Sequence, residues 1–349
     1  MNNKKRTYVA TTIYHLYLSI LHLIKDANYT ETYGENLLFL IETTPGIEVL
    51  IPTLKQRFFK EVHILSKKKT HKKELGKFNY GLRRKSTLIP YLEKKHPCLA
   101  NEKAFILASD VYLCETDSSK SYFYYLCANK GMSMIEDGAR TYIKNHSKIE
   151  YLYKTFLTNT PLAGGYNKEI TAVLAQYPDK LPAELKQKAV ELNINKELPL
   201  LKEEQKNLIF NLFLFNTPLN ISHDKKKVLV LTQPISEDNI VASEAVKIKI
   251  YKDLIDKIPK EYQIIIKTHP REKTDYSLHF NTALVLPKLF PIELLDLKDN
   301  FEFEKGYTLF STALENLKRI KERHYMGIDY LDYFASKAIK KLILHTNKS

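Results

Sequence analysis

The sequence predicts an α/β protein with two Rossmann-like domains, whose parallel sheets face each other across a cleft. Short apolar runs alternate with helical stretches, as expected for parallel strands joined by crossover helices. A second series of this kind starts at 223–234, after a polar, lysine-rich lead-in. The chain of 349 residues is long enough for two domains, and we predict them at 1–222 and 223–349.

The first domain is predicted from its apolar runs, taken in chain order. A strand over 8–13 leads into a helix over about 15–25, and further strands are expected at 35–43, 61–65, 104–109 and 132–138. A helix is expected over 117–129. Residues 147–218, with prolines at 161, 178, 182, 199 and 218, are predicted to be largely helical and connecting, which makes them a helical extension of the domain.

The second domain repeats the pattern in a shorter form. A strand within 223–234 precedes a helix over about 241–258, and strands follow at 263–266 and 283–287. FPIELL (290–295) and GYTLFSTALEN (306–316) complete the strand and loop series, and a helix is expected at the C-terminus. In sheets of this kind ligands bind beyond the carboxyl ends of the strands.

The composition favours a reduced protein that does not span a membrane. Hydrophobic residues make up 44% and charged residues 27% of the chain, which describes a globular protein. The three cysteines lack metal-ligand spacing and are read as free thiols. The apolar stretch 8–24 is too short and too polar to span a bilayer. We therefore predict a cytoplasmic protein, attached at most peripherally to the inner face of the cell membrane.

The formal charge of +14 is concentrated in one segment. Residues 55–95 hold fourteen Lys and Arg against three Glu, including SKKKTHKKELGK at 66–77. Such a segment suits nucleic acid, anionic lipid headgroups or an acidic saccharide carrier, and equally a solvated loop. The rest of the chain is nearly balanced and carries no known nucleic-acid motif, so no nucleic-acid partner is expected.

Familiar nucleotide and metal motifs are missing from the sequence. There is no GxGxxG, no GxxxxGK[ST] and no HExxH, so neither a metal site nor a cofactor is expected. A nucleotide-using enzyme of this fold must then hold phosphate with side chains and helix starts.

Four short constellations place reactive side chains at strand ends. Asp137 follows a strand in IEDG (135–138), where an acid could face a cleft, although Asp-Gly is also a common turn pair. The segment 232–238, TQPISED, carries Glu237 and Asp238 after the second domain's first strand. Ser236 and Asp238 there could equally be a helix cap and a first-turn acid.

The other two constellations are suited to phosphate. His269 ends a strand between Lys267 and Arg271 and could contact or protonate a departing phosphate oxygen; alone, it reads as a surface histidine before a turn. Ser311 and Thr312 could form a phosphate-binding helix start or an ordinary N-cap. Glu293, in FPIELL, could accept hydrogen bonds from a base or ribose.

Taken together and in this order, these segments resemble the bacterial sialyltransferases of glycosyltransferase family 52, the group containing lipooligosaccharide and capsule sialyltransferases. The resemblance is carried by IEDG (135–138), LTQPISED (231–238), IIKTHPRE (265–272), FPIELL (290–295) and LFSTA (309–313). It implies a two-domain GT-B fold. It also implies an inverting, metal-independent transfer of sialic acid from CMP-sialic acid to a galactose-type hydroxyl, and it makes a homodimer an expectation.

The resemblance also implies roles for individual residues. His269 is the acid, or the phosphate partner, at the departing CMP. The base is Asp238 or Glu237, and Asp137 stays open because the DG-motif aspartate is the base in another bacterial sialyltransferase family. The donor-binding residues are expected among Lys267, Thr268, Pro270, Arg271, Glu293, Ser311, Thr312, Gln233 and Ser236.

The expected acceptor is a galactose-terminated glycan of the bacterial surface (capsule, exopolysaccharide or lipooligosaccharide), including lipid-linked forms. Segment 55–95 could dock such an enzyme on an anionic membrane. Two alternatives stay open. One is a polysialyltransferase or another CMP- or CDP-releasing transferase of capsule synthesis, and the other is a non-catalytic, basic nucleic-acid-binding protein.

Overall fold

The computed structural model describes residues 5–25, 35–41, 44–66, 85–116, 120–144, 146–154, 161–215, 219–222, 224–297, 301–327 and 329–331. The chain forms two compact units, Met1–Lys206 and Asn207–Ser349. The division falls inside helix α13 (Glu203–Leu214), because the Phe210 ring packs against Phe290 of the second unit, with 5.4 Å between ring centroids. The predicted division at 222/223 lies further along the chain, between the end of α13 and the start of the second sheet at Lys227.

Unit 1 is built on a parallel sheet in the order β3-β2-β1-β4-β5-β6-β7. Its strands are β1 (Arg6–Ala10), β2 (Asn36–Ile41), β3 (Glu61–Leu65), β4 (Asp110–Cys114), β5 (Met132–Ile135), β6 (Ile170–Ala175) and β7 (Ala189–Glu191). Every residue of β1 and β2 is buried, as expected for central strands covered on both faces. The strand order reverses at β1, between β2 and β4.

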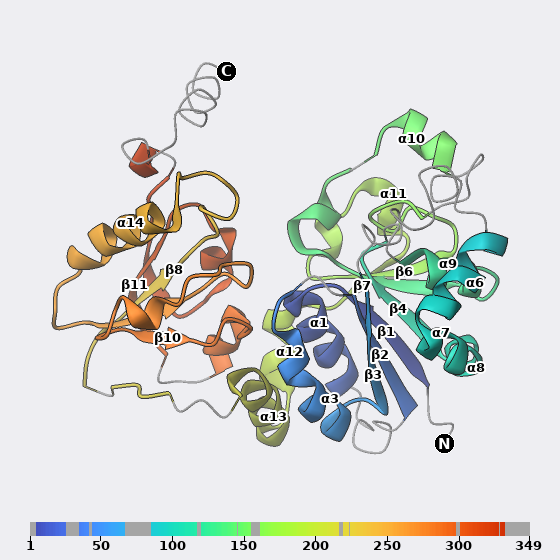
Figure 1. The fold of residues 1–349 in the computed structure, drawn as a ribbon, viewed down its shortest axis with the longest axis horizontal. Helices are drawn as coiled ribbons and strands as arrows, with labels where there is room; N and C mark the ends of the chain where they lie inside the picture. The colour runs from blue at the N-terminus through green and yellow to red at the C-terminus, as the bar shows by residue number, and fades with distance from the viewer. Residues whose placement is uncertain are drawn as a thin grey trace. The chain divides into compact units, whose positions relative to one another are not determined.

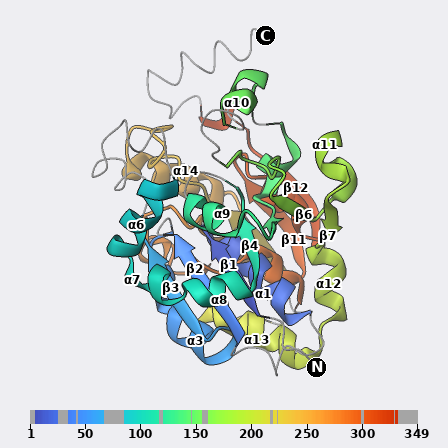
Figure 2. The ribbon, with the colours of Figure 1, turned by 90° about the vertical axis from the view of Figure 1, so that its right-hand side faces the viewer.

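Helices cover both faces of this sheet (Figure 1). One group contains α1 (Ile13–Ile24), η2 (Ile47–Leu50), α3 (Ile51–Arg57) and α12 (Ile194–Leu200). The other group contains α6 (Lys85–Lys95), α7 (Pro97–Asn101), α8 (Lys103–Ala108) and α9 (Ser121–Cys127). Figure 2 shows the second group in front of the strands. Four short elements complete the unit: η4 (Gly138–Tyr142), α10 (Lys148–Leu152), η6 (Pro178–Lys180) and α11 (Ala183–Lys186).

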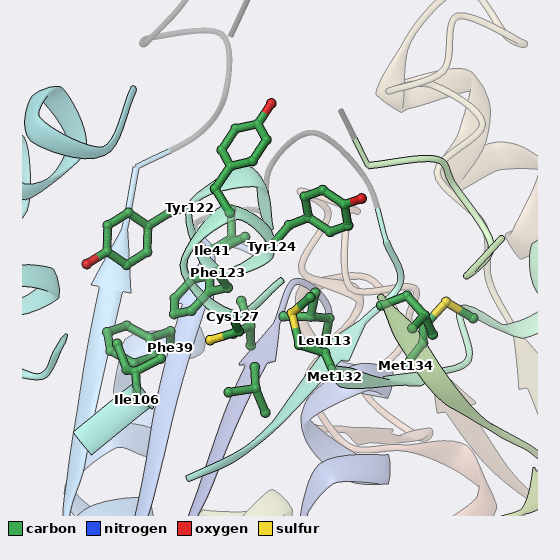
Figure 3. Packing of buried hydrophobic residues seen from close by; sticks show 14 of the residues in the cluster. Phe39, Ile41, Ile106, Leu113, Tyr122, Phe123, Tyr124, Cys127, Met132 and Met134 are labelled. Carbon is green, nitrogen blue, oxygen red and sulfur yellow. The ribbon is translucent and has the colours of Figure 1, made fainter. Parts of the chain in front are cut away.

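The core between the sheet and the second helix group is apolar and aromatic. Phe39 of β2 packs against Phe123 of α9, with ring centroids 5.0 Å apart (Figure 3). Ile106 of α8 and Met134 of β5 are completely buried in the same cluster. This packing anchors the strands whose carboxyl ends carry the polar side chains of unit 1.

Two sequence predictions for unit 1 are corrected by the structure. Residues 104–109 are not a strand: residues 104–108 lie in α8, Ser109 is its C-cap, and the strand follows at Asp110–Cys114. A short apolar run fits a buried strand or a buried helix equally well, and here the run covers the sheet instead of joining it. Residues 147–218 also contain two strands, β6 and β7, in addition to helices.

Unit 2 holds a second parallel sheet, ordered β10-β9-β8-β11-β12. The strands are β8 (Lys227–Leu231), β9 (Gln263–Lys267), β10 (Leu284–Leu286), β11 (Phe303–Thr308) and β12 (Ile320–Tyr325). β12 was not predicted, since IKERHY is too polar to read as a strand, and it lies at the sheet edge. The two Rossmann-like units with parallel sheets confirm the predicted fold class.

One long helix and several short turns complete unit 2. Helix α14 (Glu244–Asp256) begins at the N-cap Ser243 and packs Ile250, Tyr251 and Leu254 against the sheet. The 3-10 segments are η7 (Tyr276–Leu278), η8 (Ile292–Leu297), η9 (Thr312–Asn316) and η10 (Asp329–Leu331). The predicted C-terminal helix lies outside the described residues. No helix in the described ranges combines the length and apolar character needed to cross a membrane.

Candidate functional site

The predicted phosphate-facing segments of unit 2 meet at one edge of its sheet. Leu231, the last residue of β8, is in register with Lys267 of β9 and with Thr308 of β11, and Lys267 is in register with Leu286 of β10. Since all these strands are parallel, the loops after them leave from the same edge. Loops 232–238, 268–272, 287–293 and 309–312 therefore lie together, around the strand where the order reverses.

Side chains join the loop after β8 to both neighbouring loops. Thr232 Oγ1 donates to Oε2 of Glu272, 2.6 Å away, and Phe310 N–H donates to Oε1 of Gln233 at 2.9 Å. The Gln233 N–H in turn donates to the Tyr251 hydroxyl of α14 at 2.7 Å. The predicted donor-binding residue Gln233 thus holds two loops in a fixed relation.

The His269 side chain is partly buried, and a hydrogen bond to one of its ring nitrogens holds the ring in place. Its Nδ1 accepts a hydrogen bond from the Arg271 N–H at 3.1 Å, so the neutral ring carries its proton on Nε2. Burial, assisted by the charges of Arg271 and Lys267, lowers the pKa of His269 to about 4. At neutral pH His269 is therefore an uncharged hydrogen-bond donor at Nε2 in the ligand-free protein, and not the cation that its basic neighbours suggest.

Glu272 organises the histidine loop, although the sequence motifs did not predict this role. Its side chain is fully buried. Oε2 accepts from the His269 N–H at 3.2 Å as well as from Thr232, and Oε1 accepts from the Tyr276 hydroxyl at 3.1 Å. Burial raises the pKa of this carboxyl. The sequence contains one indication of this role, which is the spacing: an acid three residues after His269 can accept a hydrogen bond from the histidine backbone N–H.

Glu237 is committed to a buried ion pair. Nζ of Lys247, a residue with no exposed side-chain area, lies 2.8 and 2.9 Å from its two carboxylate oxygens. Glu237 also accepts from the Lys273 N–H at 2.8 Å and from Ser236 Oγ at 2.9 Å. Burial opposes ionisation, but these donors outweigh it and lower the pKa of Glu237 to about 2.

Lys247 is an unusual residue for its position. It lies in the first turns of α14, where the helix dipole disfavours a cation. Its Nζ is also 4.0 Å from Oε1 of Glu272. One buried cation therefore compensates two carboxylates, one from each of the loops after β8 and β9.

Asp238 is the more accessible acid of the same loop. Its two oxygens accept from the Arg271 guanidinium at 2.7 and 2.9 Å, in a bidentate pair. The side chains of Arg271 and Asp238 are 55% and 37% exposed. This pair connects the PISED and HPR segments in contact with solvent, where a ligand could reach both.

The other predicted donor-binding residues differ in their burial and in whether their polar atoms already bond within the protein. Lys267 is buried and donates to the carbonyls of Thr268 and, at 3.0 Å, Lys288; burial lowers its pKa to about 8. Ser311 caps η9 by accepting from the Ala313 N–H at 3.3 Å. Thr268 is buried, whereas Pro270 and Glu293 are half-buried; the Thr312 side chain lies outside the described part.

In unit 1, Asp137 is paired with a histidine from the start of the chain. Nε2 of His15 lies 2.7 Å from Oδ1 of Asp137, and Nδ1 of His15 accepts from the Thr11 N–H at 3.3 Å. Burial raises the pKa of Asp137, but His15 and Arg140 outweigh it, so the pKa lies below its ordinary value. The aspartate is 21% exposed, whereas His15 is buried.

The carboxylate oxygens of the neighbouring acid, Glu136, already accept several hydrogen bonds from the protein. Its carboxylate accepts from the Tyr14 hydroxyl at 2.7 Å, from the Gln176 N–H at 2.7 Å and from the Tyr142 hydroxyl. Of the two acids in IEDG, Asp137 is therefore the more exposed one, at 21% against 1% for Glu136. His15 was not predicted to take part, because nothing in the local sequence links it to Asp137.

Two solved structures are similar to this chain, and the first of them supports the fold. A 2,6-sialyltransferase of Photobacterium sp. JT-ISH-224, solved with CMP and lactose, is 12% identical, with a TM-score of 0.53 over 91% of this chain and 71% of that chain. An α/β-galactoside α-2,3-sialyltransferase of Photobacterium phosphoreum is 13% identical, with a TM-score of 0.49 over 93% and 91% of the two chains. At 12% identity the likeness to the 2,6-sialyltransferase concerns the fold alone.

Sequence comparison identifies the family. An uncharacterised protein of Haemophilus influenzae is 33% identical over 218 residues, which make up 60% of this chain and 64% of that protein. The matched region thus spans less than two thirds of that relative. The profile of glycosyltransferase family 52 matches residues 56–330, which include all five segments that carried the resemblance. The chain belongs to glycosyltransferase family 52.

Proposed function

We propose that this glycosyltransferase moves sialic acid from CMP-sialic acid to a galactose-type hydroxyl of a bacterial surface glycan, with inversion and without a metal ion. The acceptor oxygen forms the new bond to the anomeric carbon, and the bond from that carbon to the phosphate oxygen breaks. The departing CMP keeps the electron pair, and a carboxylate takes the hydroxyl proton. This division of labour requires one group at each face of the sugar.

The observation that carries the proposal is the meeting of four loops at the carboxyl edge of the unit 2 sheet. They bring His269, Arg271 and Ser311 to the strand where the order reverses. A monophosphate leaving group needs hydrogen-bond donors and positive charge, and these side chains supply both. In a member of this family, such an edge is well suited to a CMP-sugar donor.

The departing phosphate is assigned to His269. With Nδ1 already accepting from Arg271, the ring offers an N–H at Nε2. A bound phosphate would favour protonation of the ring, so donor binding would raise the His269 pKa from about 4. In this proposal the histidine first donates a hydrogen bond and gains acid character only when the anion is present.

The acceptor proton is assigned to Asp238 or Asp137. Glu237 is the weaker candidate, because its two oxygens are held by Lys247, Ser236 and a backbone N–H. Asp238 is partly exposed beside Arg271, and Asp137 is partly exposed beside His15. Asp238→Asn and Asp137→Asn, assayed side by side, should identify the base as the variant with the larger fall in kcat.

The direct test is incubation of the full chain with CMP-Neu5Ac and a panel of galactosides, with and without EDTA. We expect CMP release that depends on the galactoside and persists in EDTA. CMP release only without EDTA would contradict metal independence. No sialylated product from any galactoside would contradict the proposed acceptor class, and binding of duplex DNA with a steep salt dependence would favour the non-catalytic alternative.

A further inference from the structure

A cavity in unit 1 lies outside the side chains discussed so far. Its volume is about 370 Å³, and it is lined by Lys144, His146, Tyr151, Leu152, Tyr166 and Glu184. Ligand pockets are commonly in this size range and combine aromatic walls with a few polar groups. Figure 1 shows α10 and α11, which supply Tyr151, Leu152 and Glu184, at the same end of unit 1.

The walls of the cavity are aromatic. The His146 and Tyr166 rings are 4.3 Å apart at 75°, and the His146 and Tyr151 rings are 5.9 Å apart at 29°. Burial, with the charge of Lys144, lowers the pKa of His146, so this ring is uncharged at neutral pH. Three ring systems therefore offer apolar faces, while Leu152, 55% exposed, adds an aliphatic contact.

The charges at the cavity cancel. Lys144 and Glu184 form an ion pair, and both side chains are 52% exposed. A phosphorylated or carboxylated ligand would meet the Glu184 carboxylate as well as the lysine, so the cavity does not favour an anion. A neutral ligand with hydroxyl groups could instead hydrogen-bond to both partners and place its C–H faces on the rings.

The cavity is connected to the Asp137 region by the chain itself. Lys144 and His146 follow η4, which begins directly after Asp137 at the carboxyl end of β5. Glu184 belongs to α11, in the connection that leaves the carboxyl end of β6, the neighbouring strand. The cavity is thus formed by the segments that leave the sheet edge next to Asp137.

We infer that this cavity binds a neutral saccharide unit of the acceptor glycan, beyond the galactose that receives sialic acid. This inference rests on the proposed function, which supplies the acceptor class. The anionic donor is poorly matched to a charge-balanced aromatic cavity, whereas the interior sugars of a glycan offer both the hydroxyl groups and the apolar faces that the lining residues complement.

The experiment compares Tyr151→Ala with Tyr153→Ala in the full chain. Tyr151 lines the cavity, and Tyr153, two residues on and 48% exposed, is not among its lining residues. Dissociation constants are measured by calorimetry or ligand-observed NMR for a neutral galactose-terminated tetrasaccharide, for lactose and for CMP. Thermal unfolding checks that both variants are folded.

We expect Tyr151→Ala to weaken tetrasaccharide binding by roughly 3- to 10-fold, the range of a lost aromatic contact, with lactose and CMP binding unchanged. Tyr153→Ala should bind all three ligands as the parent chain does. Equal tetrasaccharide affinity in the parent and Tyr151→Ala, an equal loss in Tyr153→Ala, or no tetrasaccharide binding by the parent would overturn the inference.

The binding readout separates this inference from the proposed function. If tetrasaccharide binding depends on Tyr151 but no sialylated product forms, the donor assignment fails and the saccharide site stands. If sialylated product forms while Tyr151→Ala binds the tetrasaccharide normally, the proposed function stands and the saccharide site fails.

Discussion

At the scale of single residues, the site depends on which polar atoms are already occupied. His269 and Asp238 each keep part of their side chain accessible. Glu237, Lys267 and Glu272 are surrounded by donors and acceptors from the protein. The first group is accessible from solvent, whereas the second group holds the loops in position.

The role of His269 as a donor at Nε2 leads to a prediction with two variants. His269→Ala should lower kcat by roughly 100-fold or more, because the departing phosphate loses its partner. His269→Gln keeps an N–H near the position of Nε2 and should retain clearly more activity than the alanine variant. Steady-state kinetics with saturating CMP-Neu5Ac measure both effects.

Two results would count against this role. Near-normal turnover of His269→Ala would remove the histidine from the mechanism. Equal, large losses in both variants would show that the enzyme needs a protonatable ring and not merely a hydrogen-bond donor.

At the scale of elements, α14 supplies the charge that holds two loops together. Lys247 lies between Glu237 of the loop after β8 and Glu272 of the loop after β9. Tyr251, one turn further along the helix, accepts from the Gln233 N–H. The helix thus acts as a positioning element for the edge where the four loops meet.

Removing the buried cation should destabilise the fold. Lys247→Met leaves two buried carboxylates without their positive partner, and we expect a loss of about 3–5 kcal/mol in the free energy of unfolding. The matched control is Lys257→Met at the end of the same helix, where the ion pair with Asp253 is exposed and solvent screening leaves it little effect on stability. Denaturant unfolding measures both, and equal small losses would contradict the role of Lys247.

The same ion pair predicts sensitivity to acid. The pKa of Glu237 is about 2 in the folded protein, below the ordinary 4.5, so the unfolded chain binds more protons between these values. The stabilisation is complete above about pH 4.5 and is lost as the pH falls towards 2. Unfolding free energies measured across this window should fall less steeply in Glu237→Gln than in the parent chain.

A control variant separates this effect from general acid unfolding. Glu203, on α13, is 75% exposed in its pair with Lys206. Glu203→Gln should keep the slope of the parent chain. If both variants lose stability with acid as steeply as the parent, the Glu237 pair is not the source of the effect.

At the scale of the whole molecule, the chain combines two sheets of the same type with different polar edges. The unit 2 edge carries the donors suited to phosphate, and the unit 1 edge carries Asp137 with its histidine. The strongly basic part of segment 55–95, at 67–84, lies outside the described residues. Its role in membrane contact stays a prediction from sequence.

That prediction can be tested by neutralising the lysines of 67–73. We expect the variant to lose recovery with anionic vesicles, because each lysine near such a surface contributes about 1 kcal/mol of attraction. The control neutralises Lys196, Lys257 and Lys321, which are exposed elsewhere. Unchanged partitioning of the 67–73 variant in a sedimentation assay would rule the segment out as a membrane contact.

Periodicity and short motifs predicted much of the fold. The strand over 61–65 agrees residue for residue with β3, and the helix expected near 241–258 is α14. The errors arose where the local pattern fits more than one structure. Residues 104–109 are apolar enough for a strand or a helix, and the polar sequence of β12 reads as a loop but forms a strand at the sheet edge. Such segments take their structure from the neighbours they meet, which a local pattern does not contain.

By itself, the sequence determined the α/β class, the two sheets and the strand ends at which the reactive residues lie, because these follow from local alternation and chain order. Only the tertiary structure decided which of those residues are free to act. The partners of Glu237, Asp137 and Lys267 come from α14, from α1 and from the loop after β10. The pKa and the accessibility of such a group depend on donors that are distant in the chain. The packing of the folded protein therefore decides which groups face a ligand and which are structural, and the spacing of residues in the sequence does not.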